Sequence, residues 1–305
     1  MNGMSATLAL PQGWRPYLQL CKLKVVALIV FTALVGMLLA GEPGEMDLAR
    51  VFFGLVGIGL AAASGAAFNH VIDHHIDTLM ARTRDRPLPR SRLTQRSALV
   101  FATALAVVSM VVLTLLVNPL TALLTFIALI GYAVIYTIFL KRSTPQNIVW
   151  GGAAGAAPPI LGWAAVTGEV SQEALLLFLI IFVWTPPHFW ALAIRRRAEY
   201  ARAGLPMLPV THGVPYTKCQ IVLYTLLLVS VTLLPFLTRM SGLIYLSGAI
   251  SLGIGFLWYA IRLYREEGDS LAMKTFGYSI FYLSCLFAFL LLDHYVRIAI
   301  RYWLS

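Results

Sequence analysis

Three polar side chains recur at every fourth position where a long apolar stretch ends: Asn69, Asp73 and Asp77. On an α-helix a step of four residues overshoots one full turn by only about 40°, so all three side chains share one face. Two carboxylates and an amide oxygen are hard oxygen ligands, which Mg²⁺ accepts when substrate phosphates complete its coordination. The pattern therefore predicts a Mg²⁺ site at Asn69, Asp73 and Asp77.

A dense group of arginines follows these acids: Arg82, Arg84, Arg86, Arg90, Arg92 and Arg96. Their planar guanidinium groups suit bidentate phosphate binding. A basic loop that orients a membrane protein would explain the arginines alone, but not two acids on one face beside that loop. Metal-binding acids next to phosphate-binding arginines indicate a diphosphate ester, and the apolar surroundings indicate that it carries a lipid tail.

Two further segments carry basic side chains at the ends of apolar stretches. Lys141 and Arg142 close one stretch, and Arg195 and Arg196 close another, with Glu199 shortly after. A Lys-Arg pair at a helix end is commonly a membrane anchor, and its value here is its position on the same side of the membrane as the first group. The segment with Arg195, Arg196 and Glu199 repeats the arrangement of the first group, which suggests two charged sites that face each other across a cavity.

Histidines give weaker signals. His188 lies about two helical turns before Arg195 and between Trp184 and Trp190. It is either a satisfied core residue or a group that contacts a large aromatic substrate or ligates its iron, and the residues alone leave both open. His70 and His74 have the spacing of a metal pair, but no third ligand is identifiable in the sequence.

The elements that must position these residues are membrane-spanning helices. The chain has 305 residues, of which 59% are hydrophobic and only 12% charged, with a mean hydropathy of +0.80; soluble domains carry about 25% charged residues. We expect an all-α polytopic membrane protein with one domain over residues 1–305. Nine segments have the roughly 20 apolar residues that a span needs, near 23–40, 49–70, 97–117, 120–140, 147–167, 174–194, 219–238, 243–262 and 275–293.

Charge placement predicts the orientation of these nine helices. All but four of the 23 lysines and arginines fall on one side, the exceptions being Arg50, Arg239, Arg297 and Arg301. The cytoplasmic loops of membrane proteins carry an excess of lysine and arginine, so we expect a cytoplasmic N-terminus and a periplasmic C-terminus. The net charge of +10 then reflects loops that meet anionic lipid headgroups rather than a nucleic-acid partner. Among the acids on the other side, Asp293 has no evident role.

Features within the spans concern packing and chemistry. No acidic or basic side chain falls near the middle of any span, which argues against a transporter or proton pump. The small residues and prolines of 151–159 predict close helix packing followed by a bend, and Pro186-Pro187 and Pro235 predict further breaks or kinks. The cysteines share no metal or disulfide spacing.

Taken together, these motifs resemble the UbiA-type intramembrane prenyltransferases. The pattern N-x-x-x-D-x-x-x-D is matched by Asn69, Asp73 and Asp77, and the haem-modifying branch continues it as I-D-x-x-M-x-R-T-x-x-R-P, matched from Ile76 to Pro87. Similar matches are Y-T-x-x-L-K-R at 136–142, P-x-N-I at 145–148, and P-H-F-W-A-L-A-I followed by P-M-L-P-V between 187 and 210. The resemblance covers nearly all of the predicted helices.

One departure separates the chain from the quinone-type members of this family. Where they carry a second motif with three acids, this sequence has His188, Arg195 and Glu199. That replacement is typical of the haem-modifying branch, and it puts a symmetric two-metal site in doubt.

The resemblance implies transfer of the farnesyl group of farnesyl diphosphate to a vinyl group of haem b, with addition of water, giving haem O. It implies Asn69, Asp73 and Asp77 as catalytic and metal residues, with Glu199 as a candidate ligand for a second metal. It also implies Arg82, Arg86, Lys141, Arg142, Arg195 and Arg196 as diphosphate ligands. For the haem acceptor we expect His188, Trp184, Trp190 and Tyr136. We expect the protein to lie in a bacterial inner membrane with its active site facing the cytoplasm. We also expect haem O to pass to a haem A synthase or an oxidase assembly.

Two alternative functions remain. The nearer one is a prenyltransferase for an aromatic quinone precursor such as 4-hydroxybenzoate, against which stand His188 and Arg195 in place of acids. The more distant one is a haem or lipid carrier without chemistry, against which stands the face formed by Asn69, Asp73 and Asp77.

Overall fold

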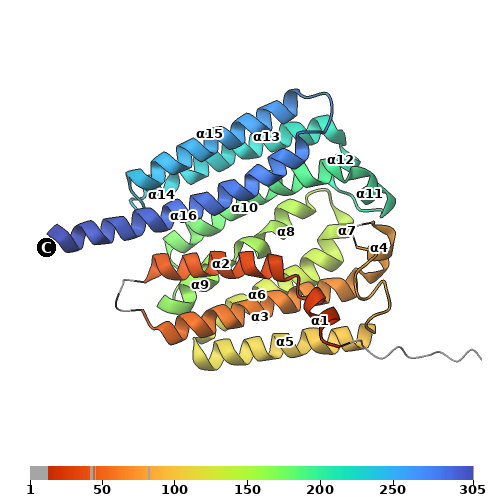
Figure 1. The fold of residues 1–305 in the computed structure, drawn as a ribbon, viewed down its shortest axis with the longest axis horizontal. Coiled ribbons are helices and arrows are strands. Elements are labelled where there is room, and N and C mark those ends of the chain that lie inside the picture. The colour runs from red at the N-terminus through yellow and green to blue at the C-terminus, as the bar shows by residue number, and fades with distance from the viewer. Residues whose placement is uncertain (1–12, 42–43, 45, 82, 305) are drawn as a thin grey trace, which may run out of the picture.

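The computed structural model describes residues 13–41, 44, 46–81 and 83–304, and its regular elements are all helices. The long helices lie roughly alongside one another (Figure 1). In chain order the elements are α1 (Arg15–Leu20), α2 (Leu23–Ala40), α3 (Leu48–Ile72), α4 (His74–Leu79), α5 (Gln95–Leu116), α6 (Pro119–Ile130), the π-helix η1 (Gly131–Leu140), α7 (Lys141–Ser143), α8 (Asn147–Ala156), α9 (Pro158–Thr167), α10 (Gln172–Arg195), α11 (Arg197–Arg202), α12 (Leu208–Thr211), α13 (Gly213–Thr232), α14 (Leu234–Leu237), α15 (Leu243–Arg265) and α16 (Ala272–Leu304).

Within the described residues, eight helical stretches are long and apolar enough to cross a membrane. They match eight of the nine predicted segments, and α6, η1 and α7 together form one of them (Pro119–Ser143). The other predicted segment, 147–167, forms α8 and α9, which have ten residues each and are separated at Ala157. Pro158 and Pro159 open α9, because proline fits the first turn of a helix but not its interior.

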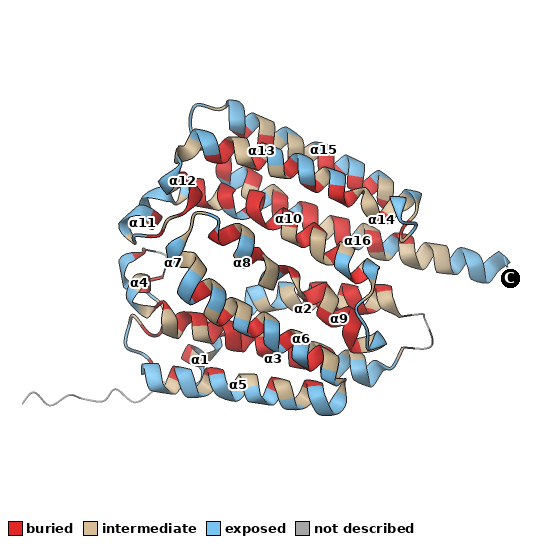
Figure 2. Cartoon of the chain, turned by 180° about the vertical axis from the view of Figure 1, so that it is seen from behind, coloured by how far each residue is buried: buried red, intermediate tan, exposed pale blue. Residues whose placement is uncertain are grey.

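The other prolines behave differently from one another. At Pro235 the predicted break is confirmed, since α13 ends at Thr232 and Pro235 lies in the first turn of α14. At Pro186 and Pro187 a break does not occur, and α10 runs through both residues. Membrane helices tolerate internal proline where neighbouring helices and side chains compensate for lost backbone bonds, and α10 is buried along most of its length (Figure 2).

The packed interior has an N-terminal and a C-terminal part. One apolar cluster joins α2, α3, α5 and α9 around Met37, Ile58 and Leu113, and another joins α10, α13, α15 and α16 around Leu177, Phe256 and Leu286. Large apolar side chains are exposed on the outer faces of many of the long helices. Such a surface fits a lipid environment rather than water.

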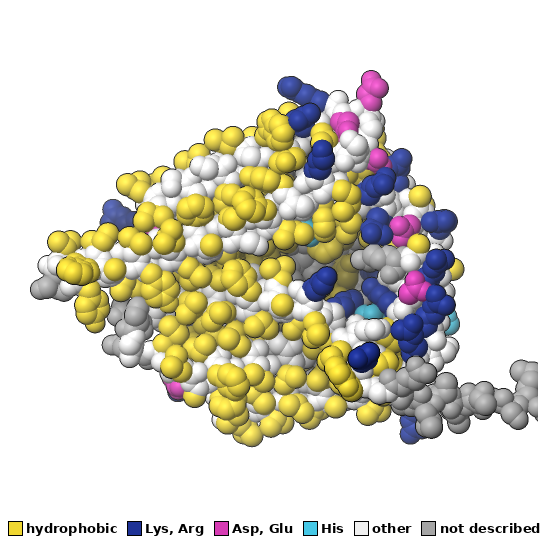
Figure 3. Space-filling view, viewed as in Figure 1, with side chains coloured by type: hydrophobic (Ala, Val, Ile, Leu, Met, Phe, Trp, Pro, Cys, Tyr) yellow, Lys and Arg dark blue, Asp and Glu magenta, His cyan; other side chains and the backbone are white. Residues whose placement is uncertain are grey.

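The two ends of the bundle differ. Lysine and arginine side chains gather at the end that carries α4, α7 and α11, and apolar side chains cover much of the remaining surface in view (Figure 3). The C-terminal end of α16 lies at the opposite end. There Asp293, 1% exposed, accepts hydrogen bonds from the backbone N–H groups of Gly242 (2.6 Å) and Tyr245 (3.2 Å). This carboxylate therefore caps the start of α15, a role that the sequence did not suggest.

Candidate active site

The three predicted metal ligands lie at the junction between α3 and α4. Asp73 links the two helices, and the N–H of Asp77 donates to its carbonyl oxygen at 2.9 Å, so the four-residue spacing continues across the junction. The Asn69 amide donates to Asp73 Oδ2 at 2.7 Å. Asn69, Asp73 and Asp77 are all at least 95% buried, with exposures of 5%, 1% and 3%.

Basic side chains from the loop after α4 and from α7 contact the two aspartates. Lys141 Nζ lies 2.5 Å from Asp73 Oδ2, and Arg142 Nη2 lies 3.6 Å from its other oxygen. Arg86 Nη1 contacts both carboxylate oxygens of Asp77, at 2.8 and 2.6 Å. The structure thus brings three of the predicted basic residues to the two aspartates, while Arg82 lies outside the described residues.

The loop that carries Arg86 is fixed by a side chain from its own first turn. Thr83, 1% exposed, donates its hydroxyl to the carbonyl oxygen of Asp77 at 2.9 Å. The backbone then turns tightly, with the N–H of Arg86 bonded to the carbonyl of Thr83. This geometry directs Arg86 back toward the acid nine residues before it.

A π-helix positions Lys141. Runs of π-helix are rare and often mark functional sites, and η1 occupies ten residues directly before Lys141. The Thr137 hydroxyl donates to the carbonyl of Tyr132, five residues earlier, at 2.8 Å, and lies 3.4 Å from the Asn69 amide nitrogen. Tyr136 stacks on Tyr132 and contacts α8 at Gly151, where a Cβ atom would stand 2.2 Å from the tyrosine ring. The predicted acceptor residue Tyr136 is therefore part of this close contact.

Sequence reasoning missed Lys22 as a site residue. Its Nζ donates to Asn69 Oδ1 at 2.7 Å, and its backbone has a left-handed conformation (φ 49°) between α1 and α2. Burial, together with the nearby positive charges of Arg86 and Lys141, lowers the pKa of Lys22 to about 7. A cation held among other cations favours a ligand with several negative charges. In the sequence Lys22 is one more loop lysine, and no local signal distinguishes it.

The second predicted group lies at the end of α10. His188 stacks between Trp184 (ring centroids 4.2 Å apart) and Phe276 (4.4 Å), and its Nδ1 lies 2.6 Å from Ser279 Oγ. Because that hydroxyl donates to the carbonyl of Phe276, it accepts from His188 Nδ1. The imidazole is thus positioned by Ser279, with Nε2 as its unprotonated nitrogen when the ring is neutral.

The remaining predicted residues of this group differ in exposure. Trp190 is 1% exposed and packs edge-on against Tyr224, and Arg195 is exposed. Arg196 pairs with Glu199 Oε1 at 3.2 Å, while Glu199 Oε2 is buried and lacks a hydrogen-bond partner within the described chain. Glu199 thus retains an oxygen suitable for a cation.

The acids at the α3–α4 junction fit a metal ion that shares its shell with a substrate. Among the described residues no group of three or more His, Cys, Asp or Glu side chains could hold a metal by itself. Asp73 Oδ1, however, is buried without a hydrogen-bond partner in the described part of the chain. One or two carboxylates plus substrate phosphates is the usual environment of Mg²⁺, and Asn69, Asp73 and Asp77 supply that donor set.

The architecture and the site define an integral membrane protein with a buried, charged site at one end of an apolar helix bundle. A profile of the UbiA prenyltransferase family matches residues 29–287. The chain belongs to this family and is a prenyltransferase, as its motifs predicted.

Individual relatives agree with the family assignment. The chain is 67% identical over 285 residues to a protoheme IX farnesyltransferase of Thioalkalivibrio sulfidiphilus, covering 93% of this chain and 94% of that protein. A solved structure from work on digeranylgeranylglyceryl phosphate synthase in membranes has a TM-score of 0.78 at 18% identity, covering 92% of this chain and 98% of the other. A UbiA homolog from Archaeoglobus fulgidus, solved with GPP and Mg²⁺, has a TM-score of 0.63 at 17% identity and covers 90% of this chain and 99% of the other. The two structures support the fold.

Proposed function

We propose that the protein transfers the farnesyl group of farnesyl diphosphate to a vinyl group of haem b, with addition of water, and releases diphosphate and haem O. The observation that carries this proposal is the set of three cation–oxygen contacts Lys22–Asn69, Lys141–Asp73 and Arg86–Asp77 in one buried site. Similarity to protoheme IX farnesyltransferases over nearly the whole chain supports the choice of acceptor.

The acids and bases of the site have complementary roles in this proposal. Without substrate the carboxylates of Asp73 and Asp77 neutralise Lys141 and Arg86. With substrate, Asn69, Asp73 and Asp77 would hold Mg²⁺, which supplies Lewis-acid stabilisation of the departing diphosphate. Lys141, Arg142 and Arg86, helped by Arg82, Arg195 and Arg196, would then bind diphosphate oxygens and stabilise their developing charge.

The apolar interior protects the reaction from water. Removing the diphosphate leaves an electron-poor allylic carbon, which bulk water would capture before the acceptor does. Buried aromatic and aliphatic side chains around α10 and α16 exclude water from the bundle. His188, Trp184, Trp190 and Tyr136 are the proposed contacts of the acceptor, and Glu199 is a candidate ligand for an additional metal ion.

The proposal includes the topology. We propose that α8 and α9 together form one more membrane crossing, the fifth of nine in chain order, in a single domain over residues 1–305. The N-terminus would lie in the cytoplasm and the C-terminus in the periplasm. Lysine and arginine gather at the end of the bundle that carries the site (Figure 3), which supports a site facing the cytoplasm. A bacterial inner membrane and onward transfer of haem O to a haem A synthase or oxidase assembly complete the proposal.

A coupled diphosphate-release assay tests this function. The purified protein in lipid receives farnesyl diphosphate and Mg²⁺, with haem b, with 4-hydroxybenzoate or with no acceptor. We expect diphosphate release that depends on haem b. Release with 4-hydroxybenzoate alone would assign the protein to quinone synthesis instead, and no release with either acceptor would favour a carrier.

A further inference from the structure

His70 is a buried polar side chain with no hydrogen-bond partner in the described part of the chain. It lies on the last turn of α3, is 2% exposed, and neither ring nitrogen has a hydrogen-bond partner within the described residues. Burying an imidazole with both nitrogens unsatisfied costs free energy, and such groups in native proteins usually have a partner. A bound ligand would supply that partner.

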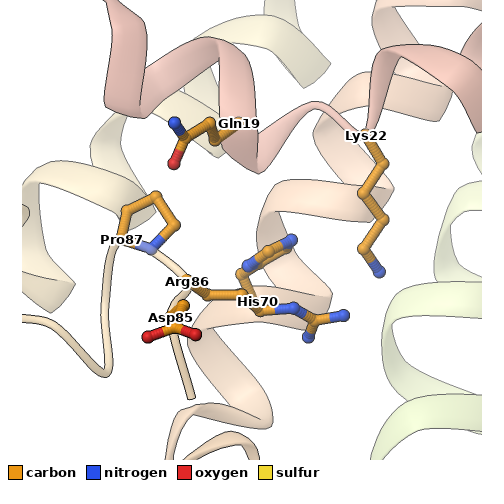
Figure 4. Close-up of a pocket in the computed structure, with 6 residues that line it drawn as sticks. All are labelled: Gln19, Lys22, His70, Asp85, Arg86 and Pro87. Carbon is orange, nitrogen blue, oxygen red and sulfur yellow. The ribbon is translucent and has the colours of Figure 1, made fainter. Parts of the chain in front are cut away.

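His70 lines a cavity of about 390 Å³ beside the metal-binding acids. The other lining residues are Gln19, Lys22, Asp85, Arg86 and Pro87. They come from α1, from the turn before α2, and from the loop after α4 (Figure 4). We call this cavity the His70 pocket.

The pocket is rich in hydrogen-bond donors. Gln19 contributes an amide and Lys22 an ammonium group, and Arg86 contacts Asp77 through Nη1, so that Nε and Nη2 are not part of that ion pair. The one acidic residue, Asp85, is paired with Arg90. An ammonium and a guanidinium group beside an amide N–H favour an anionic ligand.

Two kinds of anion take part in the proposed reaction, and their positions distinguish them. The diphosphate must lie against Asp73 and Lys141, which do not line the His70 pocket, while Arg86 borders both sites. The other anionic groups are the carboxylates of the acceptor, because haem b carries two propionates. A separate, donor-rich pocket next to the metal site suits one of these carboxylates.

We propose that the His70 pocket binds a carboxylate of the acceptor, with a ring N–H of His70 as its buried donor. Gln19, Lys22 and Arg86 supply the remaining donors. This inference rests on the proposed function and extends it, because it gives the acceptor a polar anchor at the charged end of the bundle. The rest of the acceptor can then enter the apolar interior.

The test compares haem b with its dimethyl ester, in which both carboxylates are blocked. The variants are His70→Phe, His70→Gln, which keeps an N–H donor, and Gln19→Leu, at an exposed position. His75→Phe is the matched control, because His75 is exposed and does not line the pocket. For each protein KM is measured for haem b, for the ester and for farnesyl diphosphate.

Loss of one hydrogen bond to a carboxylate should raise KM about tenfold. We therefore expect KM for haem b to rise about that much in His70→Phe and to recover largely in His70→Gln. It should rise several-fold in Gln19→Leu, and His75→Phe should match the wild type. The ester should bind weakly to the wild type and no more weakly to His70→Phe, and KM for farnesyl diphosphate should stay constant.

Two results would overturn the inference. Equal use of haem b and its ester by the wild type would exclude a carboxylate site, and a change confined to KM for farnesyl diphosphate would assign the pocket to phosphate. The wild type also separates this inference from the proposed function. No farnesylation of haem b refutes that function, whereas farnesylation that is insensitive to esterification and to His70 refutes only the pocket.

Discussion

Replacing Asp73 by asparagine tests the metal-binding role of the α3–α4 junction. The substitution preserves volume but removes the charge of a carboxylate that is 1% exposed and lies 2.5 Å from Lys141. In the proposed function, Asp73 is one of two carboxylates that hold Mg²⁺ against the diphosphate. Loss of one preorganised electrostatic group in a water-poor site costs about 2.7–4 kcal/mol of transition-state stabilisation, or 10²–10³ in turnover.

The same substitution at Asp293 is a matched control. Asp293 is also 1% exposed, but it caps α15 at the far end of the bundle. Each variant loses charge-assisted hydrogen bonds worth about 1.5–3 kcal/mol, so both should unfold at a lower temperature in detergent. Only Asp73→Asn should lose turnover.

Steady-state turnover over a range of Mg²⁺ concentrations, measured well below the unfolding temperature, separates the two effects. For Asp73→Asn we expect a lower maximal rate and a higher half-saturating Mg²⁺ concentration. Turnover within about threefold of the wild type at every Mg²⁺ concentration, a difference of only about 0.7 kcal/mol, would refute the metal assignment.

Two predictions concern the π-helix and its contact with α8. Gly151→Ala should destabilise the protein by about 1–3 kcal/mol through overpacking against Tyr136. Gly155→Ala, on the same helix, should not destabilise it, because a Cβ there meets no atom within 4 Å. Thermal unfolding of the two variants checks this. Thr137→Val should lower the free energy of unfolding by about 1 kcal/mol and lower turnover, because it removes a hydroxyl bonded within η1. Thr125→Val should leave stability unchanged or raise it, because the buried Thr125 hydroxyl has no hydrogen-bond partner among the described residues. Equal effects of the two threonine substitutions would contradict the role given to Thr137.

The main acids and several bases of the site could be predicted from sequence because their signal is local. Asn69, Asp73 and Asp77 follow the helical repeat, and Arg86 lies in the loop directly after them. Lys141 could be predicted because it closes an apolar span on the same side of the membrane. Length and hydropathy likewise predict most helix ends to within a few residues, since the cost of burying polar backbone fixes them.

Other features depend on contacts between distant segments. Lys22 donates a hydrogen bond to Asn69, 47 residues later in the chain. The left-handed backbone of Lys22 has no glycine to indicate it. The segment of η1 is mostly apolar, so its π-helical form, which packs against Gly151, has no sequence signal. Of the break or kink predicted at Pro186 and Pro187, a break does not occur, because packing around a buried helix outweighs the local preference of proline.

The mass of the haem product tests the central claim most directly. The purified protein in lipid is incubated with haem b, farnesyl diphosphate and Mg²⁺, and the extracted haem is analysed by mass spectrometry. The proposed function predicts a haem heavier by one farnesyl group plus one water, and its disappearance when a chelator removes Mg²⁺. Unmodified haem b from a folded protein that prenylates another acceptor would contradict the claim, and a product that forms equally well with chelator would contradict the metal's role.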